Sequence, residues 1–303
     1  MTERLAFIVN GASGSGRGAK VWAAVERELS RRGVRYAAAA TSSSGHATAL
    51  AQRMARDGGY ASIVAVGGDG TVHEVVAGLL GSNVPLGHIP AGSGNDFARC
   101  LRLPAGPSEA VDALIAGHTV AIDVGRANGR PFVNSFGAGF DGEVGRIANR
   151  AQWKRSMNAL GLGALAYPFA VLAALGAYRP ARVGIEVDGV PREFEGVWLA
   201  VAANMPAFGG GMRICPEASP TDGALDVCVV HGLSRWRLLR YFPRLYRGTH
   251  LDLPYVTMLR GREVRVRSDR RLYGQADGEG ADAGDATISV APAGLRVVVP
   301  AKV

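Results

Sequence analysis

The chain has 303 residues, of which 48% are hydrophobic and 20% are charged. This length allows two domains of ordinary size, and this composition excludes an intrinsically disordered protein. The formal net charge of +8 suits a polyanion, a nucleotide or an anionic membrane surface, although a high arginine content alone explains the charge equally well.

The cysteines and the N-terminus indicate a cytoplasmic protein. Cys100, Cys215 and Cys228 have no metal-ligand spacing, and their odd, sparse number fits a reducing compartment. Only five apolar residues follow Arg4, which is too short a run for the apolar part of a signal peptide.

The first part of the chain predicts a doubly wound α/β domain. Apolar runs indicate strands at residues 5–9, 34–40, 63–66 and 84–89. Helical spacing of apolar residues indicates helices ending near Arg32 and spanning 45–57, 71–80 and 108–117, with Ser108 as the N-cap of the last. Alternation of strand and helix is typical of a parallel sheet covered on both faces.

Polar, glycine-rich turns follow three of these strands, at residues 10–14, 67–71 and 92–96. The carboxyl ends of parallel strands meet at one edge of an open α/β sheet, where ligands bind. We expect the glycines at 67, 68 and 70 to take positive φ and to let a ligand approach the backbone. The helix that follows offers N–H groups and a positive dipole end to phosphate.

Asp69 does not fit a phosphate-binding turn unless it holds Mg²⁺, directly or through water. Magnesium–nucleotide binding is therefore the favoured interpretation, and a tight turn with Asp69 as N-cap is the alternative. The pattern Gly14-x-Gly16-x-x-Ala19 resembles a dinucleotide fingerprint, but the second strand ends in Thr41-Ser42-Ser43-Ser44 without the required acid. This first turn can bind phosphate or can be an ordinary loop.

Beyond residue 120 the pattern changes to short alternating strands, which predict a sandwich or a flattened barrel. The expected strands lie at residues 131–136, 182–187, 197–203, 225–230, 262–266, 286–290 and 295–299. We expect an α/β domain over 1–122 and a β-rich domain over 123–303, with a nucleotide cleft between them. The last strand could pack back toward the first domain.

Two segments interrupt the β pattern. Residues 157–178 carry no charge, but Pro168 and several glycines favour one or two buried helices, or a helical wall of an apolar pocket, over a membrane span. Residues 231–251 alternate arginines with aromatic and aliphatic residues. They predict a basic amphipathic helix, which either lies on an anionic membrane or packs on the sheet.

Acidic residues at two further turns are candidate site residues. Asp222-Gly223 precedes a strand, where it forms either a hairpin or a cation site built from the carboxylate and nearby carbonyl oxygens. Asp277 and Glu279 flank Gly278, and a carboxylate there could take a proton from a substrate hydroxyl.

Four motifs together resemble the bacterial diacylglycerol and lipid kinase family, which shares its catalytic domain with sphingosine kinases. The motifs, in order, are Gly67-Gly68-Asp69-Gly70-Thr71, Gly92-Ser93-Gly94-Asn95-Asp96, Asp222-Gly223-x-Leu225-Asp226 and Asp277-Gly278-Glu279. The resemblance covers nearly the whole chain. His73 departs from the family, in which asparagine is common at this position, and Ser93 replaces a frequent threonine.

The resemblance implies the roles of individual residues. ATP would be held by Asn10, Gly11, Ala12, Ser13, Gly14, Thr41, Gly67, Gly68, Asp69, Gly70, Thr71, Val72, His73, Glu74, Ser93, Asn95 and Asp96. Mg²⁺ would be held at the positions of Ser219, Asp222 and Ala224, joined through waters by Asp69 and Asp123. Glu279 would be the proton acceptor, with Asp277 beside it.

The predicted function is Mg²⁺-dependent transfer of the ATP γ-phosphoryl group to a lipid hydroxyl at a membrane surface. An NAD kinase-like enzyme and a non-catalytic nucleotide or lipid sensor are the alternatives. We expect a cytoplasmic protein that associates peripherally with the inner face of the membrane and binds no nucleic acid. The sequence identifies neither the lipid nor the oligomeric state, and a homodimer stays open.

Overall fold

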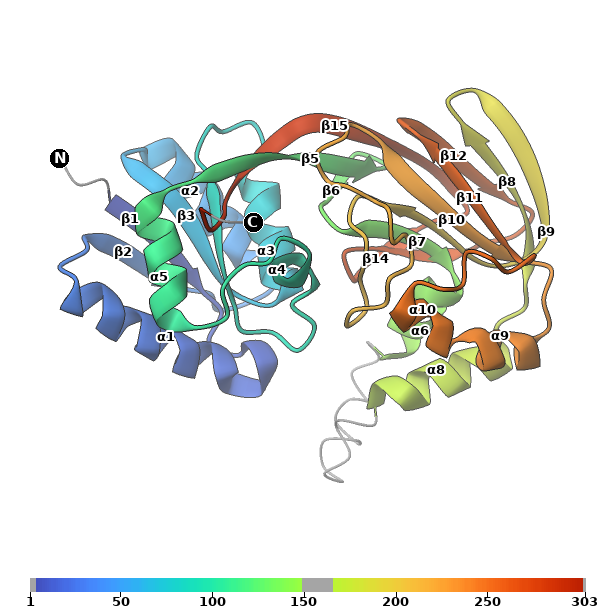
Figure 1. Ribbon diagram of the computed structural model, residues 1–303, viewed down its shortest axis with the longest axis horizontal. Helices are drawn as coiled ribbons and strands as arrows, with labels where there is room; N and C mark the ends of the chain where they lie inside the picture. Colours follow the sequence, from blue (N-terminus) through green and yellow to red (C-terminus); the bar gives the residue numbers. More distant parts are fainter. Residues whose placement is uncertain (1–3, 149–165, 302–303) are drawn as a thin grey trace.

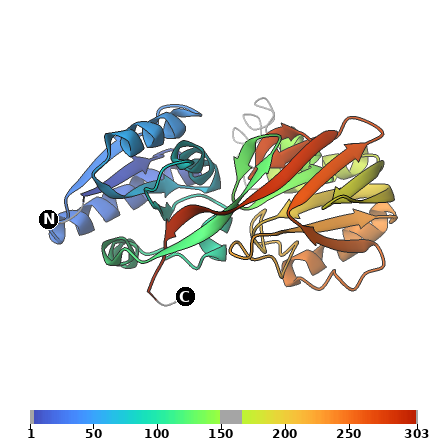
Figure 2. The same cartoon turned by 90° about the horizontal axis from the view of Figure 1, so that it is seen from above.

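A computed structural model describes residues 4–148 and 166–301 (Figure 1). The chain forms an N-terminal α/β lobe and a C-terminal β-rich lobe, which confirms the predicted fold class. Two long antiparallel strands, β5 (Thr119–Ala127) and β15 (Asp285–Val298), run from one lobe to the other (Figure 2).

The N-terminal lobe is built on a parallel sheet in the order β2-β1-β3-β4. Its strands are β1 (Arg4–Val9), β2 (Tyr36–Ala40), β3 (Tyr60–Gly67) and β4 (Leu86–Pro90). Its helices are α1 (Ser13–Arg31), α2 (His46–Asp57), α3 (Asp69–Leu79), α4 (Asp96–Cys100) and α5 (Pro107–Ala116). Both β2 and β4 begin two residues later than predicted, and α3 begins two residues earlier, at Asp69.

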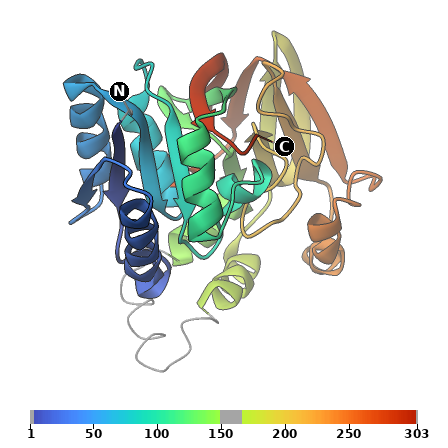
Figure 3. The same ribbon diagram turned by 60° about the vertical axis from the view of Figure 1, so that its left-hand side comes forward.

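Alternate side chains of each strand pack on opposite faces of this sheet, because the side-chain period of a strand is two. Phe7 joins the core with Val25 of α1 and Val111 of α5, whereas Ile8 packs with Leu50 of α2 and Val75 of α3. Figure 3 shows α1 and α5 together in front of the sheet. The burial of both faces confirms the doubly wound arrangement.

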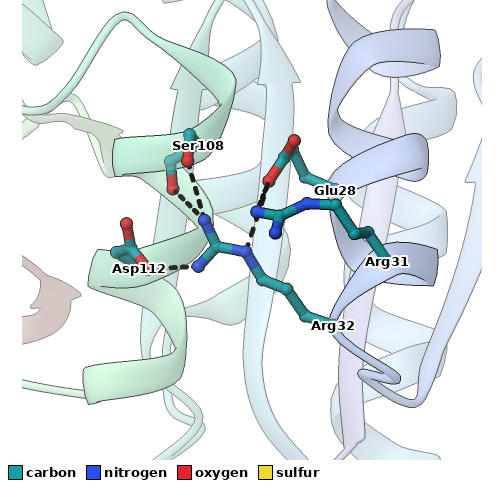
Figure 4. Close-up of polar contacts among 5 residues, drawn as sticks. All are labelled: Glu28, Arg31, Arg32, Ser108 and Asp112. Carbon is teal, nitrogen blue, oxygen red and sulfur yellow. Dashed lines mark hydrogen bonds and ion pairs between the residues drawn. The ribbon is translucent and has the colours of Figure 1, made fainter.

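An arginine joins α1 to α5 at the lobe surface (Figure 4). Arg32 donates to the Ser108 hydroxyl at 2.7 Å, to Glu28 at 3.3 Å and to Asp112. Ser108 was predicted to be the N-cap of α5, but the N-cap is Gly106. Pro107 takes the first helical position, where its fixed φ and missing N–H cost nothing, so the helix begins one residue earlier.

The C-terminal lobe contains mainly antiparallel strands. They are β6 (Arg130–Phe132), β7 (Ser135–Gly139), β8 (Ala181–Val187), β9 (Val190–Ala203), β10 (Leu225–His231), β11 (Val256–Gly261), β12 (Glu263–Ser268), β13 (Tyr273–Ala276) and β14 (Glu279–Asp282). Its helices are α6 (Phe140–Ala148), α8 (Ala166–Ala177), α9 (Arg235–Tyr241) and α10 (Pro243–Arg247).

Three predictions for this lobe need correction. The strand expected at 131–136 is interrupted, because residues 133 and 134 leave the ladder between β6 and β7. The strands expected at 286–290 and 295–299 are one strand, β15, with an irregular register between Ala291 and Leu295. The helix expected at 231–251 is divided into α9 and α10, since Pro243 has no N–H to continue the helical ladder.

The long strand β9 lets the β-rich lobe fold over on itself. Its first half pairs with β8, and its second half, from Val197 to Ala203, lies between β7 and β10. The curved sheet buries apolar side chains on both faces, with Phe136 and Val227 in one cluster and Val201 in the other. The result is a sandwich-like lobe in which the hairpin of β13 and β14 extends the sheet beyond β7, with β14 at its edge.

Much of the uncharged segment 157–178 lies outside the described residues. Within its described part, α8 buries Ala174 and Leu175 and leaves Leu172 56% exposed. Among residues 4–148 and 166–301, no helix has both the length and the apolar character needed to span a bilayer.

His88 on β4 is enclosed behind the central glycine turn. It is 5% exposed, and its Nε2 lies 3.2 Å from the carbonyl oxygen of Gly67. Burial lowers the pKa of His88 from an ordinary value of 6.5 to about 4. At a pH between these two pKa values, His88 is therefore protonated in the unfolded chain and neutral in the folded protein.

We expect this histidine to make the fold less stable in mild acid. Its contribution is complete above the ordinary pKa and is lost as the pH falls toward the folded pKa, and it amounts to about 3 kcal/mol at most. Urea unfolding of wild type and His88→Gln at pH 7.5 and pH 5 tests this. The variant should lose less stability between the two pH values than wild type, and equal losses would contradict the assignment.

Candidate active site

The three glycine-rich turns meet one carboxylate from the other lobe around a single cleft. This cleft has a volume of about 480 Å³. Its lining comes from the ends of β1, β2, β3 and β4, from the start of α3, and from Glu279 of β14. The lining residues include Asn10, Ala12, Ser13, Gly14, Thr41, Gly68, Gly70, Thr71, Glu74, Gly92 and Glu279.

The glycines of the central turn serve close packing rather than positive φ. A Cβ atom on Gly67 would lie 2.4 Å from the Thr71 hydroxyl oxygen, and one on Gly68 would lie 2.9 Å from the Cα atom of Gly92. The positive φ expected at 67, 68 and 70 is found at none of them, and Gly68 is extended at φ −99°. The second and third turns therefore touch backbone to backbone, and both line the cleft.

The first turn is fastened to the other two. The Asn10 amide donates to the Thr71 hydroxyl at 3.0 Å, and the Ser13 hydroxyl donates to the Ala91 carbonyl at 3.0 Å. Gly14 and Gly16 have φ of 57° and 89°, so the chain makes a left-handed turn at the start of α1. Such a turn exposes successive backbone N–H groups, which can bind phosphate.

Asp69 and Asp96 hold the third turn, and Asp96 also contacts the second lobe. Asp69 accepts the backbone N–H of Phe97 at 3.0 Å, so it is not the N-cap of α3, a role taken by Gly68. Asp96 accepts the N–H of Gly210 at 2.8 Å. Burial, with the nearby charge of Asp69, raises the pKa of Asp96. The Asn95 side chain closes the turn, because its amide oxygen accepts the N–H of Gly92 and its amide nitrogen donates to the Gly92 carbonyl.

Asp277 fixes the β13–β14 hairpin to the loop between β6 and β7. Its side chain is 1% exposed and accepts the backbone N–H groups of Val133, Asn134 and Ser135 at 2.7, 2.8 and 3.1 Å. With φ of 49° at Asp277 and 89° at Gly278, the turn is of the type that Asp-Gly favours in hairpins. Both carboxylate oxygens are thus engaged by structural donors.

Glu279, two residues further on, has an exposed position in the cleft. Its Oε1 lies 3.9 Å from the place that a Cβ of Gly70 would occupy, directly over the start of α3. A carboxylate there can accept a proton from a hydroxyl group placed beside a phosphate bound at this helix.

His73 bridges the two lobes. Its Nδ1 lies 3.3 Å from Oδ2 of Asp277. Burial lowers the pKa of His73, but the hydrogen bond and charge of Asp277, with the charges of Glu279 and Glu74, more than offset burial and raise it. The structure thus supplies the partner of this unusual residue, which the sequence left open.

Other predicted nucleotide-binding residues have less direct positions. Glu74 accepts the N–H of Ala47 at 3.1 Å and so joins α3 to α2 at the rim of the cleft. Val72 is buried, so only its backbone could face a ligand. Ser93 is exposed, and it is not one of the described residues that line the cleft.

The predicted metal ligands lie around the loop that precedes β10. Asp123 is 2% exposed and accepts the N–H groups of Gly223 at 2.7 Å and Ala293 at 2.8 Å. Asp222 accepts the N–H of Ala224 at 3.1 Å, and its other oxygen lies 2.7 Å from Arg260. No described trio of histidine, cysteine or acidic side chains forms a metal cluster. Carboxylate and carbonyl oxygens suit Mg²⁺, which would have to compete with Arg260 for Asp222.

An apolar pocket of about 70 Å³ lies beneath α9 and α10 in the second lobe. The sequence predicts a helical wall at 157–178, and Val171 of α8 does line this pocket, but most of its lining comes from other elements. Asp141, at the first turn of α6, also borders it and accepts a hydrogen bond from Gln275 at 2.5 Å. Burial raises the pKa of Asp141 to about 6.

We predict that Asp277→Ala impairs both stability and turnover. Three buried N–H groups would lose their acceptor, which should cost about 3 kcal/mol, and Glu279 would lose its fixed position. Urea unfolding and a phosphoryl-transfer assay measure the two effects. Asp282→Ala, at the exposed end of the same hairpin, is the matched control. Equal effects of both variants would contradict the special role of Asp277.

Comparison with known proteins places both lobes in one family. Residues 4–127 match the diacylglycerol kinase catalytic domain, and residues 134–299 match the YegS C-terminal NAD kinase beta sandwich-like domain. The chain is 37% identical to a diacylglycerol kinase of Mycobacterium tuberculosis over 249 residues, which cover 80% of this chain and 78% of that protein.

Two further similarities cover more of the chain. A diacylglycerol kinase of Bacillus subtilis is 32% identical over 282 residues, or 91% of this chain and 90% of that protein. The crystal structure of a diacylglycerol kinase from Bacillus anthracis superposes with a TM-score of 0.75 at 22% identity, covering 99% of this chain and 97% of that one. This last likeness shows the shared two-lobe fold.

Proposed function

Because this chain belongs to the diacylglycerol kinase family, we propose that it transfers the γ-phosphoryl group of ATP to the hydroxyl group of a lipid, with Mg²⁺. The observation that carries the proposal is the cleft in which Glu279 of one lobe faces the glycine turns of the other. A potential proton acceptor and a potential phosphate site thus share one space.

The first lobe would hold the nucleotide. The start of α3 at Gly68 and Asp69 offers backbone N–H groups and a positive dipole end to phosphate oxygens. Asn10, Thr41 and Thr71 line the same cleft and offer an amide and two hydroxyl groups. The other residues that the sequence assigns to ATP are likewise proposed to contact the nucleotide.

The metal would be held by oxygen ligands. Asp69, in the first turn of α3, would contribute a carboxylate from the first lobe. Ser219, Asp222 and Ala224 offer the donor set on the second lobe, with Asp123 supporting their loop. When bound, Mg²⁺ neutralises charge on the phosphate oxygens.

Glu279 would take the proton of the acceptor hydroxyl as the oxygen forms its bond to the γ-phosphorus and the bond to the β–γ bridging oxygen breaks. Asp277 would position this hairpin rather than act as the base, because both of its oxygens already accept backbone N–H groups. Most of the rate would come from holding the two reactants in line.

The acceptor is proposed to be a lipid. The lining of the pocket beneath α9 and α10 is almost wholly apolar, which matches acyl chains in chemistry and does not match the polar body of NAD. This favours a lipid over the NAD kinase-like alternative. The peripheral location at the inner face of the membrane, in the cytoplasm, follows from such a substrate.

A panel of lipids tests this function. Purified protein is incubated with ATP, Mg²⁺ and vesicles or micelles containing diacylglycerol, phosphatidylglycerol, a sphingoid base or a glycolipid, and products are detected by mass. We expect a mass gain of one phosphate on one of these lipids. Phosphorylation of NAD alone would establish the alternative kinase, and ATP binding without any product would favour a sensor.

We predict that Asp69→Ala lowers lipid phosphorylation by at least about 100-fold, because it removes a carboxylate that orients the metal and the third turn. Thermal unfolding should show that the variant is folded. A folded variant with wild-type turnover would remove Asp69 from the proposed machinery.

A further inference from the structure

We propose that α9 and α10 form the surface by which the protein docks on an anionic lipid bilayer. This assignment goes beyond the proposed activity, because binding of a bilayer can be measured without any phosphoryl transfer. Only the delivery of substrate through this surface, considered below, rests on the lipid kinase function.

The helix pair is amphipathic in a way that leaves an apolar outer side. Leu238, Tyr241, Phe242 and Leu245 face inward and line the apolar pocket. Trp236, Leu239 and Tyr246 face away and are 75%, 40% and 51% exposed. An inner apolar face is expected of any packed helix, but exposed tryptophan and tyrosine beside leucine are typical of helices that lie in a membrane interface.

The charge on this surface is positive and largely uncompensated. The pair carries Arg235, Arg237, Arg240, Arg244 and Arg247 and no acidic residue. Arg237 donates to the hydroxyl of Tyr255 and stacks over its ring at 5.5 Å. Within the described residues, Arg235, Arg240 and Arg247 are exposed and form no ion pair. Free guanidinium groups around exposed aromatic rings match phosphate headgroups above an acyl layer.

The position of the pair also suits a bilayer. α8, α9 and α10 lie on the same side of the β-rich lobe (Figure 1), and Val171 of α8 lines the same pocket as the inner face of α9. Leu172, next along α8, is 56% exposed, so α8 also presents an apolar side chain to solvent. A second copy of the chain fits this surface poorly, because its arginines would oppose those of the partner across a two-fold interface.

Docking through this surface would place the apolar pocket against the acyl layer. The pocket volume of about 70 Å³ equals the volume that only two or three water molecules occupy in the liquid. An acyl chain can therefore enter only if the helices above the pocket move. A bilayer that takes up the outer apolar side chains would favour such movement. Under the proposed function, the acceptor lipid then enters from beneath α9 and α10.

Vesicle sedimentation with the full chain tests the docking surface. Wild type should bind vesicles containing phosphatidylglycerol more tightly than pure phosphatidylcholine vesicles. The triple variant Arg235→Gln, Arg240→Gln, Arg247→Gln should bind the anionic vesicles roughly 10-fold to 100-fold more weakly. The control Arg27→Gln, Arg53→Gln, Arg56→Gln removes the same charge from exposed positions on α1 and α2 and should bind as wild type does.

Two other outcomes of the vesicle experiment would overturn the proposal. Equal loss in both triple variants would show attraction by net charge alone, and equal binding to both vesicle types would exclude recognition of anionic lipid. Trp236→Ala should also weaken vesicle binding by several-fold. If it instead converts a dimer into a monomer in analytical ultracentrifugation without changing vesicle binding, the surface is a subunit contact.

Activity separates docking from catalysis. The triple variant should lose activity toward lipid in anionic vesicles in proportion to its lost binding, and should keep wild-type turnover of a short-chain lipid dissolved as monomers. If no lipid is phosphorylated by any form, the proposed function fails while the vesicle-binding result still decides the docking surface.

Discussion

The attachment of the β13–β14 hairpin by Asp277 is the interaction on which the site depends. Glu279 belongs to the second lobe, yet it must stand over a helix start in the first lobe. Three backbone N–H groups hold the Asp277 carboxylate, and His73 reaches it from α3. Because these donors are held in the buried loop between β6 and β7, the neighbouring Glu279 has little freedom to leave the cleft. The lobes are further joined by β5 and β15, and the end of β15 pairs with the start of β4 at Leu86.

The parts of this arrangement that depend on local pattern were predictable from the sequence. Apolar runs ending in glycine turns identify β1, β3 and β4, and the rule that such turns share one edge of a sheet predicts that Asn10, Gly68 and Gly92 lie together. The Asp277-Gly278 pair likewise marks a hairpin. These signals lie within a few residues of each other along the chain, which is the range over which propensity and periodicity act.

The features that were wrong or missed depend on contacts between distant residues. Close backbone packing of Gly68 against Gly92 explains these glycines without positive φ. No pattern near Asp277 shows that its carboxylate is enclosed by residues 133–135, and no pattern near His73 shows its partner. The apolar pocket is lined by residues of α6, α8, β9, α9 and α10, so no single stretch of sequence predicts it.

The central claim is that Glu279 takes a proton at a cleft whose other wall binds the nucleotide. Single-turnover phosphoryl transfer by Glu279→Gln, measured beside its ATP affinity, tests this most directly. The account predicts that ATP affinity stays within about twofold of wild type while transfer slows by about 100-fold or more, since only the proton acceptor is lost. Wild-type transfer by this variant, or a loss that lies wholly in ATP binding, would contradict it.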